Sequence, residues 1–275
     1  MLHFARLSLG RRFIGRQGLD RLLFVMLLAA WGIGCLGWSL IALPLRRILP
    51  SRISDQVGQS GVRTGFRILI GLMQASGLCR FDLSALDRLD SDKALVIAAN
   101  HPGLLDAVLV TARLPRVVCI SKASLWNNMF LGGGIRLAGY PRHDSALALV
   151  RGGIASLGRG RHLLVFPEGT RTMPGMAVQP FHGGFAVMAK AAGVPVQTIL
   201  IDAAGPYLRK DWPLLRMPPL PIVISVRLGR RFTVEGDVKR FVSGLESYFR
   251  SELAPGAPWP IAEPRHEAVR LHQPA

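Results

Sequence analysis

The stretch that decides the fold is ALVIAANHPGLLD, which occupies residues 94–106. Its first six residues are apolar and are typical of a buried strand. The polar residues Asn100 and His101 follow that strand directly, and Asp106 stands on the first turn of the helix that we expect next. The sequence therefore predicts a strand, a turn and a helix, with a histidine and an aspartate on either side of the turn.

Short apolar runs and helical stretches alternate through the rest of the chain. The other runs that we interpret as strands are Val117–Ile120, His162–Phe166, Val196–Ile201 and Ile222–Leu228. The candidate helices are Asp106–Arg113, Asp144–Leu157, Phe185–Ala192 and Val238–Leu253. Such alternation is typical of a largely parallel sheet with helices on both faces. We therefore expect an α/β fold with a mixed, largely parallel sheet flanked by helices.

Polar side chains follow three of these strands. Asn100 and His101 follow the first, Lys122 follows the second, and Glu168 follows the third. In open α/β sheets, ligands bind beyond the carboxyl ends of the strands. We therefore expect these residues to gather at one edge of the sheet.

An uncharged run rich in Leu and Ala occupies Leu22–Leu45 and is long enough to cross a membrane. A signal peptide would have a shorter apolar region and a cleavage site, whereas arginines follow this run. Two interpretations stay open: a single span, and a re-entrant hairpin bent around Gly32, Gly34 and Gly37. Positive charge on both flanks gives no orientation. A second apolar stretch, Phe66–Met73, is too short to span and is expected at the membrane interface.

The apolar run divides the chain into three predicted parts. Residues 1–62 are expected to form an N-terminal membrane anchor, and residues 63–253 the catalytic α/β domain. Residues 254–275 are rich in Pro and Ala with scattered charges, so this tail is expected to have no fixed fold.

The charge of the chain indicates an anionic partner. Lys and Arg number 34 against 17 Asp and Glu, and 49% of the 275 residues are hydrophobic. Nucleic acid and an anionic membrane surface both suit such a balance. The arginines are spread out and lack the interleaved aromatic residues of a nucleic-acid stacking platform, so we favour lipid and expect no nucleic-acid partner. Cys35, Cys79 and Cys119 have no metal-ligand spacing and are interpreted as inert thiols.

The first cluster that could do chemistry is Asn100 to Asp106. If the Asp106 carboxylate accepts the Nδ1 proton of His101, the imidazole tautomer is fixed and Nε2 is free to act as a general base. The proton donor for such a base is a substrate hydroxyl. The pattern His-x4-Asp is short and common, however, and taken alone it favours a helix-capping Asp106 with an unrelated His101.

The second cluster is FPEGTRT, residues 166–172. Gly169 lets the backbone approach a ligand closely, and Arg171 offers a planar fork that suits phosphate. Glu168 could orient a substrate hydroxyl or hold an arginine. A solvated turn is the alternative, but this mixture of residues at the same sheet edge as His101 favours a site.

With NHPGLLD and FPEGTRT together, the chain resembles the lysophospholipid acyltransferase family, the PlsC-like glycerolipid acyltransferases. The resemblance runs from about Leu95 to Gly229 and includes further stretches of sequence. They are Lys122–Trp126, Phe181–Gly184, Gly193–Pro195 and Val226–Gly229. The resemblance implies the glycerolipid acyltransferase fold.

Carried over by position, the resemblance implies that His101 is the general base and Asp106 its orienting partner. Glu168, Gly169, Thr170 and Arg171 are then expected to line the site of a phosphorylated acceptor.

The family's intermediate motif ends in an arginine that binds the acceptor phosphate, and Arg142 fits that place. Asp144 is expected to cap the helix after it. Asn100 and Lys122 are possible supporting residues. The apolar run that usually precedes the arginine is replaced here by Ala138–Pro141, and the proline often found after Pro195 is Thr198. These departures leave the identity of the acceptor head group open.

The reaction implied by the resemblance is direct transfer of a fatty acyl group from acyl-CoA or acyl-ACP to the hydroxyl of a lysophospholipid, with 1-acyl-sn-glycerol-3-phosphate favoured. We expect no cofactor, no metal and no acyl-enzyme. The expected partners are membrane lipids, the lysolipid acceptor, and acyl carrier protein or coenzyme A. The expected location is the bacterial inner membrane, with the catalytic domain on the cytoplasmic side.

Three alternatives stay open. The acceptor could be a different lyso-lipid, such as lyso-ornithine lipid. The enzyme could be a hydrolase that uses His101 on a thioester or phosphate ester. The chain could also be a non-catalytic basic domain that binds anionic lipid or nucleic acid. Dependence of turnover on the acceptor separates a transferase from a hydrolase, and salt-dependent nucleic-acid binding without transfer would favour the last alternative.

Overall fold

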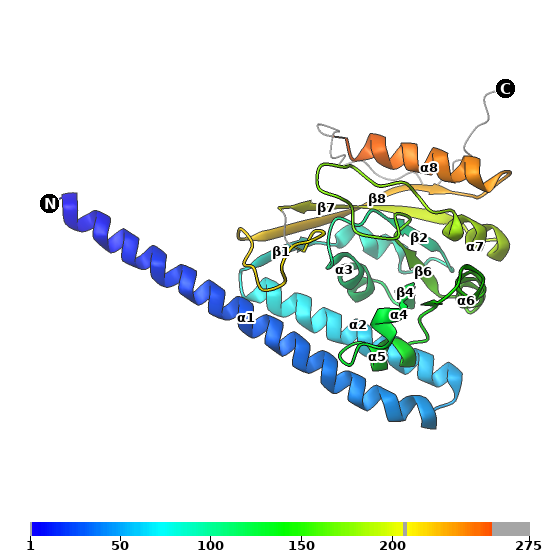
Figure 1. Cartoon of the computed structure of the whole chain (residues 1–275), viewed down its shortest axis with the longest axis horizontal. Helices are drawn as coiled ribbons and strands as arrows, with labels where there is room; N and C mark the ends of the chain where they lie inside the picture. The colour runs from blue at the N-terminus through cyan, green and yellow to red at the C-terminus, as the bar shows by residue number, and fades with distance from the viewer. Residues whose placement is uncertain (1, 206–207, 255–275) are drawn as a thin grey trace.

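The computed structural model of the chain describes residues 2–205 and 208–254. Its centre is a six-stranded sheet in the order β1-β8-β7-β2-β6-β3 (Figure 1). The strands are β1 Cys79–Asp82, β2 Val96–Ala99, β3 Val117–Cys119, β6 His162–Val165, β7 Val196–Ala204 and β8 Ile222–Phe232. All neighbouring strands are parallel except β7 and β8. The predicted mixed, largely parallel α/β fold is confirmed.

Helices cover both faces of the sheet (Figure 1). One face carries α1 Leu2–Ile48, α2 Ser51–Ala75, α3 Asp106–Arg113 and the short helix η1 Ser84–Leu89. The other carries α6 Ala146–Gly158, α7 Gly184–Ala192 and α8 Val238–Glu252. Side chains of β2 alternate between the two cores: Ile97 and Ala99 pack toward the first, Val96 and Ala98 toward the second. Because both faces are covered, this strand is apolar throughout rather than alternating.

Several elements escaped prediction. The edge strand β1 is one. The long helix α2 and the short helix η1 are two others. The rest are short: β4 Ser121–Lys122 and β5 Arg142–His143, which form a separate two-stranded sheet, and the helices α4 Ala123–Trp126 and α5 Gly132–Leu137. Each of the five predicted strands is present. The predicted tail, residues 254–275, lies outside the described residues except for Ala254.

The N-terminal region is a pair of long helices. Helix α1 runs through Gly32, Gly34 and Gly37 without a break, so the chain does not bend at these glycines. The reversal lies between Ile48 and Ser51, where α2 begins. Helix α2 is continuous across the predicted boundary between residues 62 and 63 and contains the whole second apolar stretch. The anchor and the α/β domain therefore share one helix.

Close packing joins these helices to the rest of the domain. A Cβ added at Gly133 of α5 would clash with the Ser39 carbonyl oxygen of α1, and one added at Gly58 of α2 would clash with the backbone of Ala138. The Asp55 carboxylate of α2 pairs with Arg159 and with Arg161, which is buried. Glycine is required at positions 58 and 133, because at each of them two backbones meet.

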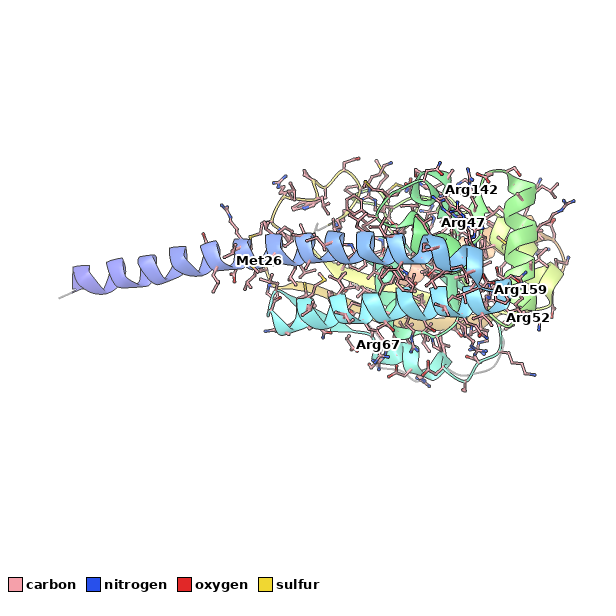
Figure 2. The ribbon with its side chains drawn as sticks, turned by 90° about the horizontal axis from the view of Figure 1, so that it is seen from below. Met26, Arg47, Arg52, Arg67, Arg142 and Arg159 are labelled. Carbon is pink, nitrogen blue, oxygen red and sulfur yellow. The ribbon has the colours of Figure 1, made fainter. Side chains whose placement is uncertain are left out.

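Helix α1 is long and apolar enough to cross a membrane over Gln17–Ile48, and only 17% of its most apolar stretch is buried within the protein. A core helix of a water-soluble domain would be mostly buried. Its N-terminal part extends away from the sheet (Figure 1), and seen from below, α1 and α2 lie side by side (Figure 2).

Candidate active site

The candidate site lies beyond the carboxyl ends of three adjacent strands. His101 follows β2, the FPEGTRT stretch follows β6, and the segment from Leu208 onward follows β7. Strand β2 pairs in parallel with both β6 and β7, so these three connections emerge side by side. The expected gathering of polar groups at one sheet edge therefore follows from the strand order.

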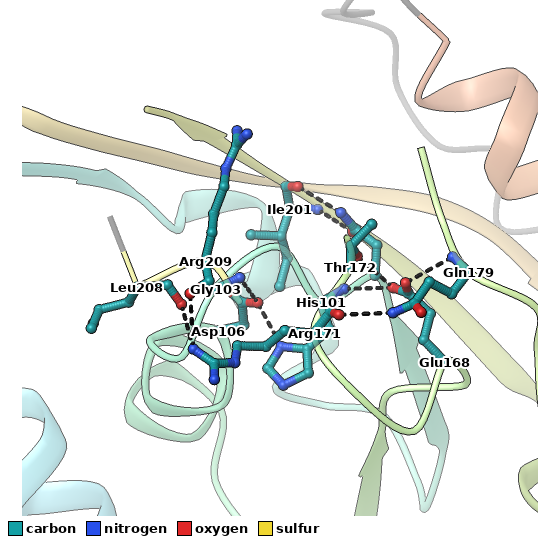
Figure 3. Close-up of polar contacts among 11 residues, drawn as sticks. His101, Gly103, Asp106, Glu168, Arg171, Thr172, Gln179, Ile201, Leu208 and Arg209 are labelled. Atoms are coloured by element: carbon teal, nitrogen blue, oxygen red, sulfur yellow. Dashed lines mark hydrogen bonds and ion pairs between the residues drawn. The ribbon is translucent and has the colours of Figure 1, made fainter. Parts of the chain in front are cut away.

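His101 and Asp106 face each other across the turn that joins β2 to α3 (Figure 3). Nδ1 of His101 lies 2.8 Å from Oδ2 of Asp106, and the backbone N–H of Gly103 donates to the same oxygen over 2.8 Å. The carboxylate is an acceptor only, so Nδ1 carries a proton and Nε2 presents its lone pair. The alternative of an unrelated histidine does not match this geometry.

Burial sets the electrostatics of the pair. The side chain of Asp106 is 1% exposed and that of His101 16%. Burial raises the pKa of Asp106, while the hydrogen bonds from His101 and Gly103 and the charge of Arg171 act in the opposite direction. The imidazole also stacks on the Phe166 ring, with 3.9 Å between centroids. The ring of His101 is thus fixed at one edge and on one face.

Glu168 is bound to the protein through both carboxylate oxygens. Its Oε1 accepts from the backbone N–H of His101 over 3.0 Å and from the Thr172 hydroxyl over 2.8 Å, and its Oε2 accepts from the backbone N–H of Gln179 over 2.9 Å. Only 3% of the residue is exposed. Burial raises the pKa of Glu168, and these three hydrogen bonds oppose the shift. A carboxylate so occupied holds the loop in place, and its predicted role in lining an acceptor site stays a prediction.

Arg171 lies beside the His101–Asp106 pair (Figure 3). Its Nη1 donates to the carbonyl oxygens of Leu208 and Arg209, 3.0 Å away in each case. Its charge is also one of the influences that oppose the rise in the pKa of Asp106 caused by burial. Arg171 therefore connects the FPEGTRT stretch to the segment after β7.

Gly169 and Thr170 complete the same stretch. Gly169 has a φ of +66°, and a Cβ there would lie 3.0 Å from the His182 ring. Both the backbone conformation and the contact favour glycine. Gly169 is exposed and Thr170 half-buried, so this part of the loop faces outward.

Asn100, Lys122 and Arg142 occupy different places. The Asn100 side chain is buried and exchanges two hydrogen bonds with the backbone of Ile201, which fixes the end of β2 to β7. Lys122 is exposed on β4, next to Arg142 and His143 of β5. Strand β4 follows β3, and β6 lies between β3 and β2. Lys122 and Arg142 are therefore one strand further from His101 than the FPEGTRT stretch, which follows β6.

Arg142 is held at the surface by two neighbours. Its Nε lies 2.6 Å from Oδ1 of Asp144, and its guanidinium carbon lies 5.5 Å from the centre of the Trp126 ring. Ser145, rather than Asp144 as predicted, caps α6, because its hydroxyl oxygen accepts from the backbone N–H of Ala148. Asp144 is therefore the partner of Arg142 instead of the cap.

The residues that sequence reasoning missed act mostly through their backbones. Gln179 donates its N–H to Glu168, and Leu208 offers its carbonyl oxygen to both Arg171 and the N–H of Leu104. A backbone group carries no residue-type signal. The strand-end argument, applied to β7, would have pointed to the segment that begins at Leu208. Among the described residues, no group of three or more His, Cys, Asp or Glu side chains is placed to hold a metal ion.

Comparison with known proteins gives a consistent picture. The model of the Acyltransferase family matches residues 80–202. This range includes the residues described above that follow β2, β3 and β6. A 1-acyl-sn-glycerol-3-phosphate acyltransferase of Pseudomonas aeruginosa is 27% identical over 235 residues, which are 83% of this chain and 86% of that protein. A lyso-ornithine lipid O-acyltransferase of the same organism is 32% identical over 41% of this chain and 48% of its own length.

A solved structure shares the fold. The crystal structure of the 1-acyl-sn-glycerophosphate acyltransferase PlsC from Thermotoga maritima has a TM-score of 0.63 and 19% sequence identity. The match covers 86% of this chain and 95% of that one, so it extends over most of the described elements.

Proposed function

The chain belongs to the PlsC-like acyltransferase family, and on this premise we propose that it transfers a fatty acyl group from acyl-CoA or acyl-ACP to the free hydroxyl of a lysophospholipid. The acceptor we favour is 1-acyl-sn-glycerol-3-phosphate, because the relative matched over most of both chains is named for that activity. The observation that carries the proposal is the 2.8 Å contact between Nδ1 of His101 and Asp106, which leaves Nε2 as a base.

The proposed mechanism is direct transfer. Nε2 of His101 takes the proton of the acceptor hydroxyl while that oxygen attacks the thioester carbonyl carbon. The tetrahedral intermediate then breaks its carbon–sulfur bond, and the leaving thiolate takes up the proton that His101 carries. Asp106 stabilises the imidazolium formed between these steps. The stacking of Phe166 on the imidazole restrains the orientation of the ring.

We propose two arginines for acceptor recognition. Arg171 lies nearest to the His101–Asp106 pair and has only Nη1 engaged by the two carbonyls, so the rest of its fork is available for a phosphate oxygen. Arg142, more than a third exposed, has Asp144 as its counterion. A phosphate group at Arg142 would have to displace Asp144.

The membrane is the proposed location, with α1 as the anchor. The support is its length, its apolar composition and its low burial within the protein. Insertion in a bacterial inner membrane with the α/β domain on the cytoplasmic side suits this proposal, because both acyl donors are cytoplasmic thioesters.

The lyso-ornithine lipid acceptor is a second candidate, favoured by the 32% identity to an enzyme named for that reaction. The deciding experiment incubates the full chain in vesicles with acyl-CoA or acyl-ACP and a panel of lysolipids, and identifies the products by mass spectrometry. Formation of phosphatidic acid supports the favoured acceptor, and acylation of lyso-ornithine lipid alone would replace it. Release of free fatty acid without any acceptor would instead indicate a thioester hydrolase.

A further inference from the structure

An apolar turn lies between β7 and β8, in the segment Leu208–Pro221. The backbone N–H of Arg216 donates to the Pro213 carbonyl oxygen over 3.0 Å, which closes a four-residue turn. Leu214 and Leu215 are its two central residues, and they are 52% and 75% exposed. Turn centres favour Gly, Asn, Asp and Ser, so two adjacent leucines at this place are unexpected in water.

The turn is held rigidly in this exposed position. Nε1 of Trp212 donates to the Arg216 carbonyl oxygen over 3.1 Å, and the Arg216 guanidinium stacks on the Trp212 ring at 4.8 Å from its centre. Trp212 and Leu220 pack against the core cluster that includes Phe24 of α1. The leucines are therefore presented outward from a fixed base.

The charge around the turn complements an anionic surface. Arg209, Lys210 and Arg216 lie in the segment with a single acid, Asp211. Basic residues that flank exposed apolar side chains are typical of segments that insert into the headgroup region of a bilayer. In Figure 1 the segment, in yellow, lies below the sheet at its left end, on the side of α1 and α2.

We propose that the Pro213–Arg216 turn is a second membrane contact, in which Leu214 and Leu215 enter the lipid bilayer next to the active site. The base of the segment is bonded to that site, since the Leu208 carbonyl oxygen accepts from Nη1 of Arg171 and from the N–H of Leu104. Contact of the turn with lipid thus fixes the loop that follows His101. The consequence for activity rests on the proposed function, whereas the lipid contact itself does not.

The first test places a fluorophore on the turn. In the full chain carrying Cys35→Ser, Leu215→Cys is labelled with nitrobenzoxadiazole and reconstituted into phosphatidylcholine–phosphatidylglycerol vesicles. Cys79 and Cys119 stay unlabelled, because burial raises the pKa of each to about 12. The matched control is Leu147→Cys, at a 60% exposed leucine of α6, on the other face of the sheet.

The expected result is quenching at position 215 by nitroxides on lipid acyl chains, with protection from aqueous iodide, and the reverse at position 147. Iodide quenching at 215 equal to that at 147 would overturn the proposal. Protection from both quenchers would also overturn it, because protein rather than lipid would then cover the turn.

The second test measures transfer. Leu214→Ser with Leu215→Ser is expected to lower turnover of a bilayer-embedded acceptor about tenfold, and to leave turnover of a short-chain, water-soluble acceptor within about twofold. Leu147→Ser is expected to change neither. Equal losses on both acceptors would contradict the lipid contact, whereas absence of transfer in the unmodified chain would count against the proposed function and leave the quenching result intact.

Discussion

Glu168 accepts a hydrogen bond from the backbone N–H of His101, while the His101 carbonyl oxygen accepts one from the backbone N–H of Thr172 over 2.8 Å. The FPEGTRT stretch therefore holds the base proposed for catalysis through both its backbone N–H and its backbone carbonyl. The carboxylate of Glu168 also accepts from the Thr172 hydroxyl and from Gln179. The two stretches that stand out in the sequence thus form one hydrogen-bonded unit.

Glu168→Gln tests whether this residue positions His101 or binds the acceptor. Glutamine supplies one acceptor oxygen where three donors converge, so one or more backbone N–H groups lose their partner and His101 shifts. We expect kcat to fall about a hundredfold with little change in the acceptor KM, since small displacements of a base have effects of this size. Steady-state kinetics with varied acceptor provide the measurement. A raised acceptor KM with unchanged kcat would indicate instead that Glu168 binds the acceptor.

Asp106→Asn tests the tautomer argument. An amide in this place can donate to Nδ1, which moves the imidazole proton to Nε2 and removes the base. We expect a loss in kcat of about ten-thousand-fold, as in hydrolase triads with the same change, and His101→Ala should abolish transfer. Circular dichroism and vesicle flotation serve as controls for folding and membrane binding. A loss of only about twofold in Asp106→Asn would reduce the carboxylate to a structural role.

Arg171→Ala and Arg142→Ala test acceptor recognition separately. Each change removes a charge-assisted contact worth about 1.5–3 kcal/mol, which corresponds to an increase in acceptor KM of about 10- to 150-fold. Arg171→Lys is the matched variant, because it keeps the charge and loses the fork. An unchanged KM together with a lower melting temperature in Arg171→Ala would mean that its bonds to Leu208 and Arg209 are its whole function.

Much of the fold could be predicted because apolar runs report burial directly. Strands β2 and β6 are short, interior and largely apolar, the edge strand β3 is also apolar, and α3 begins and ends at the predicted residues. Strand β1 could not be predicted in this way, because its sequence, CRFD, is half polar and it lies at an edge of the sheet. The sequence left a hairpin bent at Gly32, Gly34 and Gly37 open beside a single span; α1 is continuous there, since glycines in a long apolar helix need not bend it.

The candidate site was predictable where side chains determine it and unpredictable where backbones do. The five-residue separation of His101 and Asp106 suits a strand–turn–helix connection, so their pairing could be anticipated. The partners of Glu168 and Arg171 are largely backbone N–H and carbonyl groups, which any residue could supply. Their positions depend on which strands are adjacent, and that order is set by the tertiary fold.

His162, at the start of β6, gives the chain a predicted sensitivity to acid. Its side chain is fully buried, and neither ring nitrogen has a hydrogen-bond partner among the described residues. Burial, aided by the charge of Arg116, lowers its pKa from 6.5 to about 4. The unfolded chain therefore binds a proton below pH 6.5 that the folded chain takes up only near pH 4. Stability contributed by the neutral ring is present above pH 6.5 and is lost as the pH falls toward 4.

We expect His162→Leu to remove this part of the acid sensitivity. The shift corresponds to a loss of about 3 kcal/mol in the free energy of unfolding of the unmodified chain between these pH values. Urea unfolding in detergent micelles at a series of pH values measures it, with the same substitution at the exposed His182 as the control. If the His162→Leu chain loses as much stability on acidification as the unmodified chain, His162 is not the group responsible, and the slope must come from other residues.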